Sequence, residues 1–422
     1  MDKFLLIIIL YLPFQLALNP MAGVDLASIR VLILLLFFVW LAQGLKKKNL
    51  QIKNNWQTGL VVAFLFLNVI SIIVAKNTDW SIRKLLFLFS IFPLYFVASQ
   101  LISSREKALK IIKTAVFGGA VIAIIGILQF VSQFVFGLER TYSVWANFII
   151  TPFLGSSFSA AVLKNPSWLV NIAGQTYLRA TSLFPDPHMF SFYLGLLAPL
   201  AFGLIVQAKN KKKAAILSFS LIIVADLLTF SRGGYVGLFV GLVFMGIFAW
   251  AGLHKNYKVI TTIVFLSGLA ILFVPSPISQ RFLSSFDLNE GSNQGRLQMW
   301  QKASAVILDK PFLGTGIGNY PLEVVATATY RDPIYAHNTY LDIAVETGIL
   351  NMSVWLGILI LVAVGFWRKA KKERLFFFAL VSLIIFATHS MVETAIYSPV
   401  VLSLFLIIIS LNNMELQNEK TV

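Results

Sequence analysis

The sequence predicts an all-α polytopic membrane protein with about twelve transmembrane helices, and three observations predict it. Of the 422 residues, 58% are hydrophobic. Only 12% are charged, which is about half the share in ordinary soluble domains. The apolar residues also fall into runs of roughly the length that crosses a hydrocarbon layer as a helix. So few polar residues cannot cover so much apolar surface, which excludes a soluble globular enzyme, a disordered chain and a fibrous repeat.

The predicted helices follow the apolar runs along the chain. The runs lie near 4–18, 29–44, 58–75, 84–102, 114–136, 187–207, 214–230, 234–252, 259–275, 350–367, 375–390 and 398–411. The first run is either a retained helix or the core of a signal peptide. We expect a retained helix, because no clear small-residue cleavage site follows the run.

Two long segments separate these runs, near 137–186 and 276–349. The second contains the pattern Leu297, Trp300, Ala303 and Ile307 within residues 295–307, and this spacing predicts an amphipathic helix. We therefore divide the chain into helices one to nine with the first long segment (1–275), an external loop with the amphipathic helix and a histidine segment (276–349), and helices ten to twelve with a tail (350–422).

The basic residues predict the orientation. Alternate connections between the runs carry Lys46, Lys47, Lys48, Lys53, Arg105, Lys107, Lys110, Lys113, Lys209, Lys211, Lys212, Lys213, Lys255, Lys258, Arg368, Lys369, Lys371, Lys372 and Arg374. With Lys3 and Lys420 they make 21 of the 34 basic residues. Basic connections stay in the cytoplasm, so we expect both termini there and both long segments outside. This distribution also accounts for the net charge of +16 without a nucleic-acid partner.

The sequence lacks cysteine and Asp-x-Asp pairs, which limits the kinds of catalytic and metal site that it can form. The chain has no cysteine, which excludes disulfides, thiolate zinc sites and a cysteine nucleophile. No Asp-x-Asp pair is present to hold a metal–diphosphate complex. We therefore expect neither a metal nor a cofactor.

Polar residues beside apolar runs are candidate functional groups, because the bilayer disfavours them. Arg179 precedes a Pro-Asp-Pro-His turn, where helix N-terminal amides and an arginine suit an anion. The structural alternative is that Asp186 caps the helix and pairs with Arg179. Arg232 ends the seventh run, where it either binds a ligand or extends to the membrane interface. Arg296 begins the amphipathic helix.

His337 is the candidate base. Asp342 and Glu346 follow it in a helix-like stretch, and a carboxylate there would orient the imidazole ring. His188, His389 and Glu393 are also predicted near the outer surface. We interpret Asp226, inside the seventh run, as the buried partner of another polar group.

Three arginines and a histidine on the outer face suit a phosphorylated substrate. Arginine binds phosphate oxygens through two parallel hydrogen bonds and keeps its charge at any ordinary pH. Arginines beside a departing lipid diphosphate would stabilise its negative charge, and histidine would take the proton from an attacking sugar hydroxyl.

Several motifs resemble those of the O-antigen ligase and O-antigen polymerase superfamily. Between 295 and 349 the chain reads Gly-Arg, then Trp, then KPFLGTGIGNYP (310–321), then HNTYLDIAVETGI (337–349). FSRGG (230–234) and RATSLFPDPHMFSFYL (179–194) are similar to two further segments of that family. The resemblance covers about 179–367. Ser182 and Asp186 stand where the family usually has Gly and Asn.

The resemblance implies a GT-C-like fold that transfers a glycan at the outer face of the bacterial cytoplasmic (inner) membrane. The donor would be an undecaprenyl-diphosphate-linked glycan, and transfer would be inverting and metal-independent. The resemblance assigns Arg232, Arg296 and Arg179 to the donor diphosphate and His337 to the base, with Asp342, Glu346 and His188 as supporting residues.

Two alternatives stay open. A ligase transfers to lipid A-core, whereas a polymerase transfers to another lipid-linked repeat, and both share these motifs. A secondary transporter also often has twelve helices, but its site is expected near the bilayer midplane between related halves.

Overall fold

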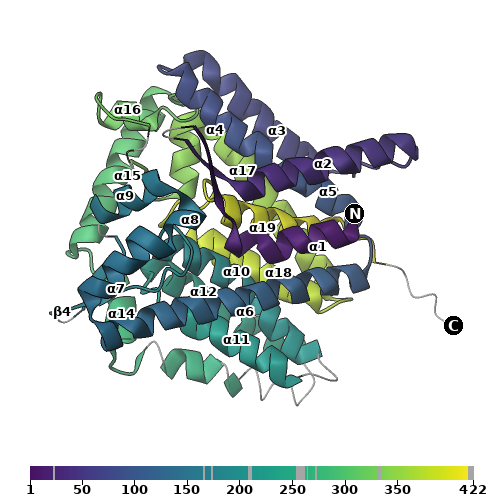
Figure 1. Ribbon diagram of the computed structural model, residues 1–422. Coiled ribbons are helices and arrows are strands. Elements are labelled where there is room, and N and C mark those ends of the chain that lie inside the picture. Colours follow the sequence, from purple (N-terminus) through teal and green to yellow (C-terminus); the bar gives the residue numbers. More distant parts are fainter. Residues whose placement is uncertain are drawn as a thin grey trace.

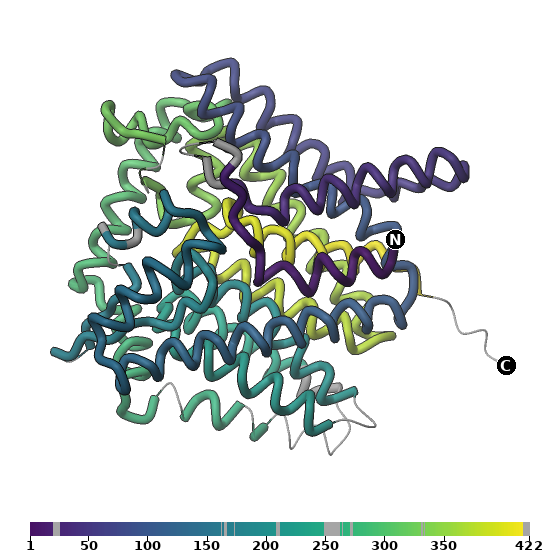
Figure 2. Tube along the Cα trace, viewed as in Figure 1, coloured from purple at the N-terminus to yellow at the C-terminus, as the bar shows by residue number. Residues whose placement is uncertain are grey.

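The computed structural model describes residues 1–21, 24–164, 167–172, 174–207, 212–252, 262–263, 265–270, 273–330, 332 and 334–416, and most of them are helical (Figures 1 and 2). Parts of the ninth predicted run (259–261, 264 and 271–272) and Lys209, Lys211, Lys255, Lys258 and Lys420 lie outside the described residues.

Within those ranges, six helical segments are long and apolar enough to cross a membrane: Ser28–Lys46, Trp56–Val74, Thr78–Leu101, Arg105–Phe136, Pro187–Gln207 and Thr339–Ala370. Three shorter apolar segments are Arg232–Phe248, Leu375–His389 and Pro399–Asn413. The chain is therefore an α-helical membrane protein by length and composition, and the count of twelve spans stays a prediction.

The first half of the chain contributes helices to the main core and carries both hairpins. Its elements are α1 (Asp2–Tyr11), η1 (Leu12–Phe14), β1 (Ala17–Met21), β2 (Val24–Ala27), α2 (Ser28–Lys46), α3 (Trp56–Ile70), η2 (Ser71–Val74), α4 (Thr78–Ile91), α5 (Pro93–Leu101), α6 (Arg105–Phe136), α7 (Leu138–Val144), η3 (Trp145–Ile149), α8 (Thr151–Leu154), α9 (Ser156–Lys164), β3 (Leu169–Ile172) and β4 (Gln175–Leu178). Helix α1 ends well before the end of the first apolar run. Pro13 lies in the turn η1 that follows, and it lacks the amide that would continue the α-helix.

The second half supplies the central helices and the long loop segment. Its elements are α10 (Pro187–Gln207), α11 (Lys212–Leu227), α12 (Arg232–Gly252), α14 (Pro277–Leu283), η4 (Ser284–Phe286), α15 (Gly291–Asp309), α16 (Tyr320–Val324), α17 (Thr339–Ala370), α18 (Leu375–His389), α19 (Pro399–Ser410) and η5 (Leu411–Asn413). The predicted amphipathic helix is present within α15, which packs against α17.

Two small antiparallel hairpins depart from the all-α expectation. β1 pairs with β2, and β3 pairs with β4 in a register that joins Leu169 to Leu178. β3–β4 lies in the first long segment, which also holds the short helices α7, α8 and α9. This segment is therefore a structured layer rather than an irregular loop.

Helix α10 is the centre of the bundle. It is almost entirely buried and packs against α6, α11, α12, α18 and α19. Such burial is possible because every residue from Met189 to Gly203 is apolar, small or a tyrosine apart from Ser191. Its N-terminus is thereby fixed among the ends of neighbouring helices.

The motif KPFLGTGIGNYP docks into a break in α17. Gly348 has a φ of 89°, and the Ile349 amide donates to the Pro311 carbonyl instead of continuing the helix. The Thr315 amide donates to the Val345 carbonyl on the other side of the break. A Cβ at Gly348 would lie 1.8 Å from the Phe312 oxygen, so only glycine fits. This docking fixes the first turns of α17.

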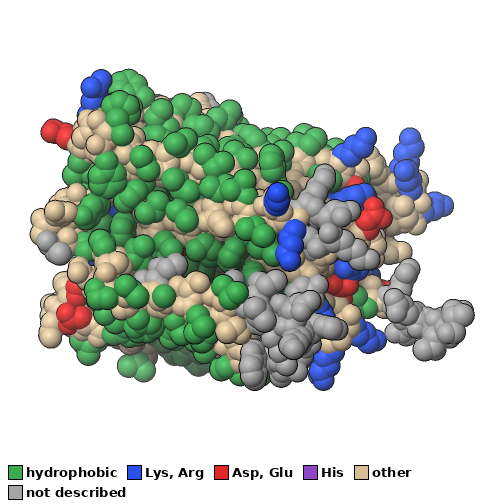
Figure 3. Space-filling model, turned by 90° about the horizontal axis from the view of Figure 1, so that it is seen from below, with side chains coloured by type: hydrophobic (Ala, Val, Ile, Leu, Met, Phe, Trp, Pro, Cys, Tyr) green, Lys and Arg blue, Asp and Glu red, His purple; other side chains and the backbone are tan. Residues whose placement is uncertain are grey.

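The bundle has two chemically different ends. Residues predicted to be cytoplasmic pair with one another at one end: Lys53 with Glu415 at 2.8 Å, Lys107 with Asp2 at 3.0 Å, and Arg105 with Glu373. Figure 3 shows a broad hydrophobic surface with most of the visible Lys and Arg side chains gathered towards the right-hand end of the view. The opposite end, at the left of Figure 1, carries α7, α9, α15 and α16.

Candidate active site

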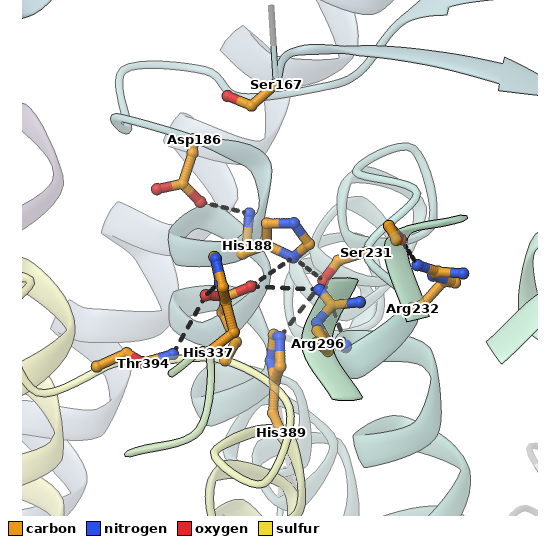
Figure 4. A network of polar contacts seen from close by, with 12 residues as sticks. Ser167, Asp186, His188, Ser231, Arg232, Arg296, His337, His389 and Thr394 are labelled. Carbon is orange, nitrogen blue, oxygen red and sulfur yellow. Dashed lines mark hydrogen bonds and ion pairs between the residues drawn. The ribbon is translucent and has the colours of Figure 1, made fainter. Parts of the chain in front are cut away.

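The candidate residues meet at that opposite end, where five helix ends converge. His188 begins α10, Arg232 begins α12, Arg296 lies in the second turn of α15, and His337 precedes α17. His389 ends α18. In Figure 4, His188, Ser231, Arg296, His337 and His389 point towards one another, and Arg232 lies to one side.

Glu393 is the charge that joins this cluster. Its carboxylate lies 2.8 Å from His337 Nδ1 through Oε1, and 3.5 Å from Arg296 Nη2 and 3.9 Å from His188 Nδ1 through Oε2. Burial acts to raise the pKa of this carboxyl, but His337, His188 and Arg296 hold it well below its usual value. Glu393 is therefore a stable anion between a candidate base and a candidate diphosphate-binding arginine.

His337 is oriented by Glu393. The negative charge of Glu393 raises the pKa of His337 against the opposing effect of burial. Because Nδ1 bonds to the carboxylate, a neutral ring carries its proton there and leaves Nε2 as an acceptor. The residue has a φ of 49°, a left-handed conformation that costs energy in non-glycine residues. Strain at a half-buried histidine with an ion-pair partner is typical of an active site.

A second polar chain runs inwards from Glu393. His188 Nδ1 lies 3.0 Å from Ser231 Oγ, which lies 3.4 Å from His389 Nε2. The His389 ring stacks on Phe192, with the centroids 3.6 Å apart. The predicted supporting residue His188 therefore belongs to the cluster.

Arg232 points to a neighbouring anion rather than to Glu393. Its Nη1 lies 2.6 Å from Glu290 Oε2, and its Nη2 donates to Ser292. Arg281 approaches the same carboxylate at 3.8 Å. Burial and the charge of Arg232 lower the pKa of Arg281 to about 10. The two arginines thus share one carboxylate.

Arg179 is fully occupied by backbone carbonyls. Its Nε, Nη1 and Nη2 donate to Thr229, Ser167 and Phe230, at 2.7, 3.2 and 3.3 Å. Burial, reinforced by the charge of Arg281, lowers its pKa to about 9. Arg179 is 4% exposed, and its guanidinium holds the turn before Arg232 through two of these bonds.

The turn after Arg179 contains Ser182 and Asp186, the two residues that stand where the resembled family usually has Gly and Asn. Asp186 Oδ1 accepts from the amides of His188 and Met189, so it caps α10 as the structural alternative predicted. The second part of that alternative, an ion pair with Arg179, is wrong, because the Arg179 guanidinium bonds backbone carbonyls instead. Burial raises the pKa of Asp186 to about 6. Ser182 has a φ of 53°, a conformation that glycine adopts without cost.

Arg296 and Trp300 have donors without acceptors. Among the residues that the structure describes, no acceptor bonds Arg296 Nε or Trp300 Nε1, although both atoms are buried. The two residues lie one turn apart on α15, so both donors line one side of the helix. Buried donors are normally satisfied, which points to acceptors from a ligand.

Asp342 and Glu346 contact other partners, and the carboxylate on the His337 ring is Glu393. Asp342 accepts from the Ala336 amide at 2.8 Å and from Thr394. Glu346 bonds Lys84 at 2.7 Å and Tyr397 at 2.8 Å. The helix carries both side chains away from a residue that lies before its first turn, so they support the segment rather than the ring.

Asp226 is interpreted from the sequence, whereas Arg281 and Glu290 are not. Asp226 is buried and bonded to Ser191 at 2.6 Å, which confirms its interpretation as a buried partner. Arg281 and Glu290 were not singled out, because an arginine and a glutamate in a polar external segment carry no signal of their own. Among the described residues, no three His, Asp or Glu side chains are grouped to hold a metal ion.

Comparison with known proteins identifies part of the chain. Residues 217–356 match the family model described as O-antigen ligase. This confirms the resemblance over a segment that includes Arg232, Arg281, Glu290, Arg296 and His337. No curated protein matches the chain.

Proposed function

We propose that this chain, which carries an O-antigen ligase domain at residues 217–356, transfers a glycan from an undecaprenyl-diphosphate donor to an acceptor sugar hydroxyl. The observation that carries the proposal is the His337–Glu393 pair beside Arg296, at the end of the bundle opposite the basic connections. Because basic connections face the cytoplasm, this end faces outwards.

In the proposed reaction His337 acts as the general base. Its Nε2 accepts the proton of the acceptor hydroxyl while the oxygen attacks the anomeric carbon from the side opposite the diphosphate. The bond from that carbon to the phosphate oxygen breaks, and the electron pair leaves with the lipid diphosphate. Glu393 stabilises the imidazolium that forms, and Arg296 and Arg232 stabilise the leaving diphosphate. The reaction is inverting and needs no metal.

The assigned roles differ among the three arginines. Arg296 has an unsatisfied Nε and a long contact to Glu393, so it is available to a phosphate oxygen. Arg232 is available once Glu290 moves. Arg179 contributes positive charge, but each of its three guanidinium nitrogens donates to a backbone carbonyl, so we assign it to positioning residues 229–231.

An apolar cavity supports a lipid donor. It has a volume of about 310 Å³ and lies among α10, α11, α12 and α18, lined by Phe202, Phe219, Leu227, Phe239, Leu242 and Met245 among others. Leu227 and Phe239 bound it on the side of Tyr235, whose hydroxyl bonds the Leu227 carbonyl. We propose that the first units of the polyprenyl chain occupy this cavity while the diphosphate lies at the arginines.

The test is transfer by purified protein given lipid-linked glycan and acceptor in the presence of EDTA. We expect His337→Ala to lower kcat by about 10²- to 10⁴-fold while donor binding is retained, because only the base is removed. Lys302→Ala, an exposed change on α15, is the control. Full activity of His337→Ala would falsify the base assignment, and a requirement for Mg²⁺ would refute metal independence.

The acceptor distinguishes a ligase from a polymerase. If lipid-linked repeats alone give a ladder of products on a gel, the enzyme is a polymerase. If product forms only when a lipid A-core or other final acceptor is added, it is a ligase. Uptake of a solute into liposomes without any glycan product would instead support a transporter.

A further inference from the structure

The carboxylate of Glu290 occupies a site built for an anion. Oε2 accepts from Arg232 at 2.6 Å and from the Ser292 and Asn293 amides at 3.0 and 3.1 Å. Oε1 lies 3.8 Å from Arg281. Two guanidinium groups and the first amides of a 19-residue helix therefore surround one side-chain carboxylate. The same donors suit a phosphate group equally well.

The charge balance of this site favours an anion with more than one charge. The Arg232 and Arg281 side chains are only 4% and 15% exposed, so solvent screens their mutual repulsion poorly. Glu290 supplies a single negative charge against two positive ones. One phosphate of a diphosphate diester supplies the same single charge as Glu290, and the adjoining phosphate adds a second charge and further acceptor oxygens nearby, so the diphosphate as a whole satisfies the two arginines better.

Glu290 is also the more exposed partner. Its side chain is 28% exposed and lies in the connection from η4 to α15. Arg232 and Arg281 are 4% and 15% exposed, and Arg232 begins α12 directly after Ser231 and Phe230. An entering anion therefore displaces the glutamate and not the arginines.

The anion site around Glu290 lies between the apolar cavity, which we propose for the lipid, and the Arg296 and His337 cluster, which we propose for the sugar end of the donor. Phe282, next to Arg281, packs on Phe239 of the apolar cavity, with the ring centroids 5.5 Å apart. On the other side, Ser292 and Arg296 lie one turn apart on α15 and lead towards His337. A phosphate at Arg232 and Arg281 is thus on the lipid side, and one at Arg296 is on the sugar side.

We propose that Arg232, Arg281 and the first turn of α15 bind the lipid-side phosphate of the donor, and that Glu290 occupies this site as an internal anion until the donor displaces it. This rests on the proposed function for the identity of the donor. Arg281 is then a substrate-binding residue, and Glu290 weakens donor binding and limits occupation of the site by stray anions.

The test uses inorganic diphosphate as the probe, both as a ligand in calorimetric titration and as a competitor of transfer. Glu290→Gln keeps an acceptor for the α15 amides but removes the charge. We expect it to tighten diphosphate binding about tenfold and to lower the donor KM similarly, with kcat little changed. Adding Arg281→Ala to Glu290→Gln should reverse the tightening.

Asp287→Asn is the matched control. It removes a carboxylate from the same connection, where Asp287 caps the Asn289 amide and contacts neither arginine. We expect diphosphate affinity to stay unchanged. Weaker diphosphate binding in Glu290→Gln, or equal tightening in Asp287→Asn, would overturn the proposal. If diphosphate binding follows the expected pattern but wild-type protein transfers no glycan, the anion site stands and the proposed function fails.

Discussion

At the scale of single residues, the candidate site depends on shared carboxylates. Glu393 is bonded to His337 and approached by Arg296, while Glu290 is shared by Arg232 and Arg281. Each carboxylate thus balances positive groups whose charges would otherwise repel in a poorly solvated region. Removing one changes the electrostatics of every group that it contacts.

The variant Glu393→Gln should show whether Glu393 positions and tunes the His337 ring or only stabilises the fold. Because Glu393 raises the pKa of His337, its neutralisation should lower that pKa. Transfer needs the neutral ring, so activity rises with pH through this pKa. The acidic limb of kcat/KM should therefore move to lower pH in the variant, while the maximal rate falls because the imidazolium loses its counter-ion.

The measurement is kcat/KM for the donor between pH 5 and 9, the range around a histidine pKa. A variant that merely folds less well would lose amplitude at every pH and keep the limb in place. An unmoved limb would contradict the positioning role of Glu393.

At the scale of elements, the break in α17 fixes where the His337 segment lies. Residues 311–315 fill the break. The residues that follow bond to the membrane helices, since the Ile317 amide donates to Ser71 Oγ and Asn319 bonds Asn77 and Ser81. The glycine-rich motif is therefore a structural clamp that holds the segment before α17 against η2 and α4.

Gly348→Ala should destabilise the protein strongly. Its left-handed φ alone costs about 1–3 kcal/mol with a side chain, and the Cβ would clash with the Phe312 carbonyl. Gly357→Ala in the same helix is the control, since its Cβ would meet only the end of the Leu60 side chain, at 3.3 Å. Thermal unfolding of the detergent-solubilised variants measures the difference, and equal unfolding temperatures would contradict the clamp.

At the scale of the whole molecule, function depends on which end faces outwards. The ion pairs among the predicted cytoplasmic connections lie at one end, and the arginine and histidine cluster lies at the other. The asymmetry of basic residues therefore predicts that the proposed donor is used on the outer side of the membrane.

The absence of cysteine from the sequence makes this orientation directly testable. Gln298→Cys on exposed α15 should react with a membrane-impermeant maleimide in intact spheroplasts. Lys47→Cys, exposed after α2, should react only once the membrane is permeabilised. The opposite labelling pattern would invert the topology and place the site in the cytoplasm.

Much of the fold was determined by the sequence itself. Apolar runs specify membrane helices locally, because each backbone must satisfy its hydrogen bonds within its own segment, and α10 spans the predicted run 187–207. Polar residues near such runs also marked Arg232, Arg296 and His337 as candidate site residues, because the bilayer tolerates so few of them, and their roles stay predictions. The sequence did not predict the hairpins or the break in α17, since these depend on contacts with distant segments.

The tertiary structure alone decided which side chains pair. Arg179 donates its hydrogen bonds to backbone carbonyls and, at 4% exposed, does not face an open space that a ligand could enter. The carboxylate that bonds the His337 ring is Glu393, 56 residues further along the chain, and not Asp342 or Glu346. Hydrogen bonds and ion pairs act over a few ångströms, whereas spacing along the chain says only which residues share a helix face. The partners were therefore fixed by how helix ends pack, which no local pattern encodes.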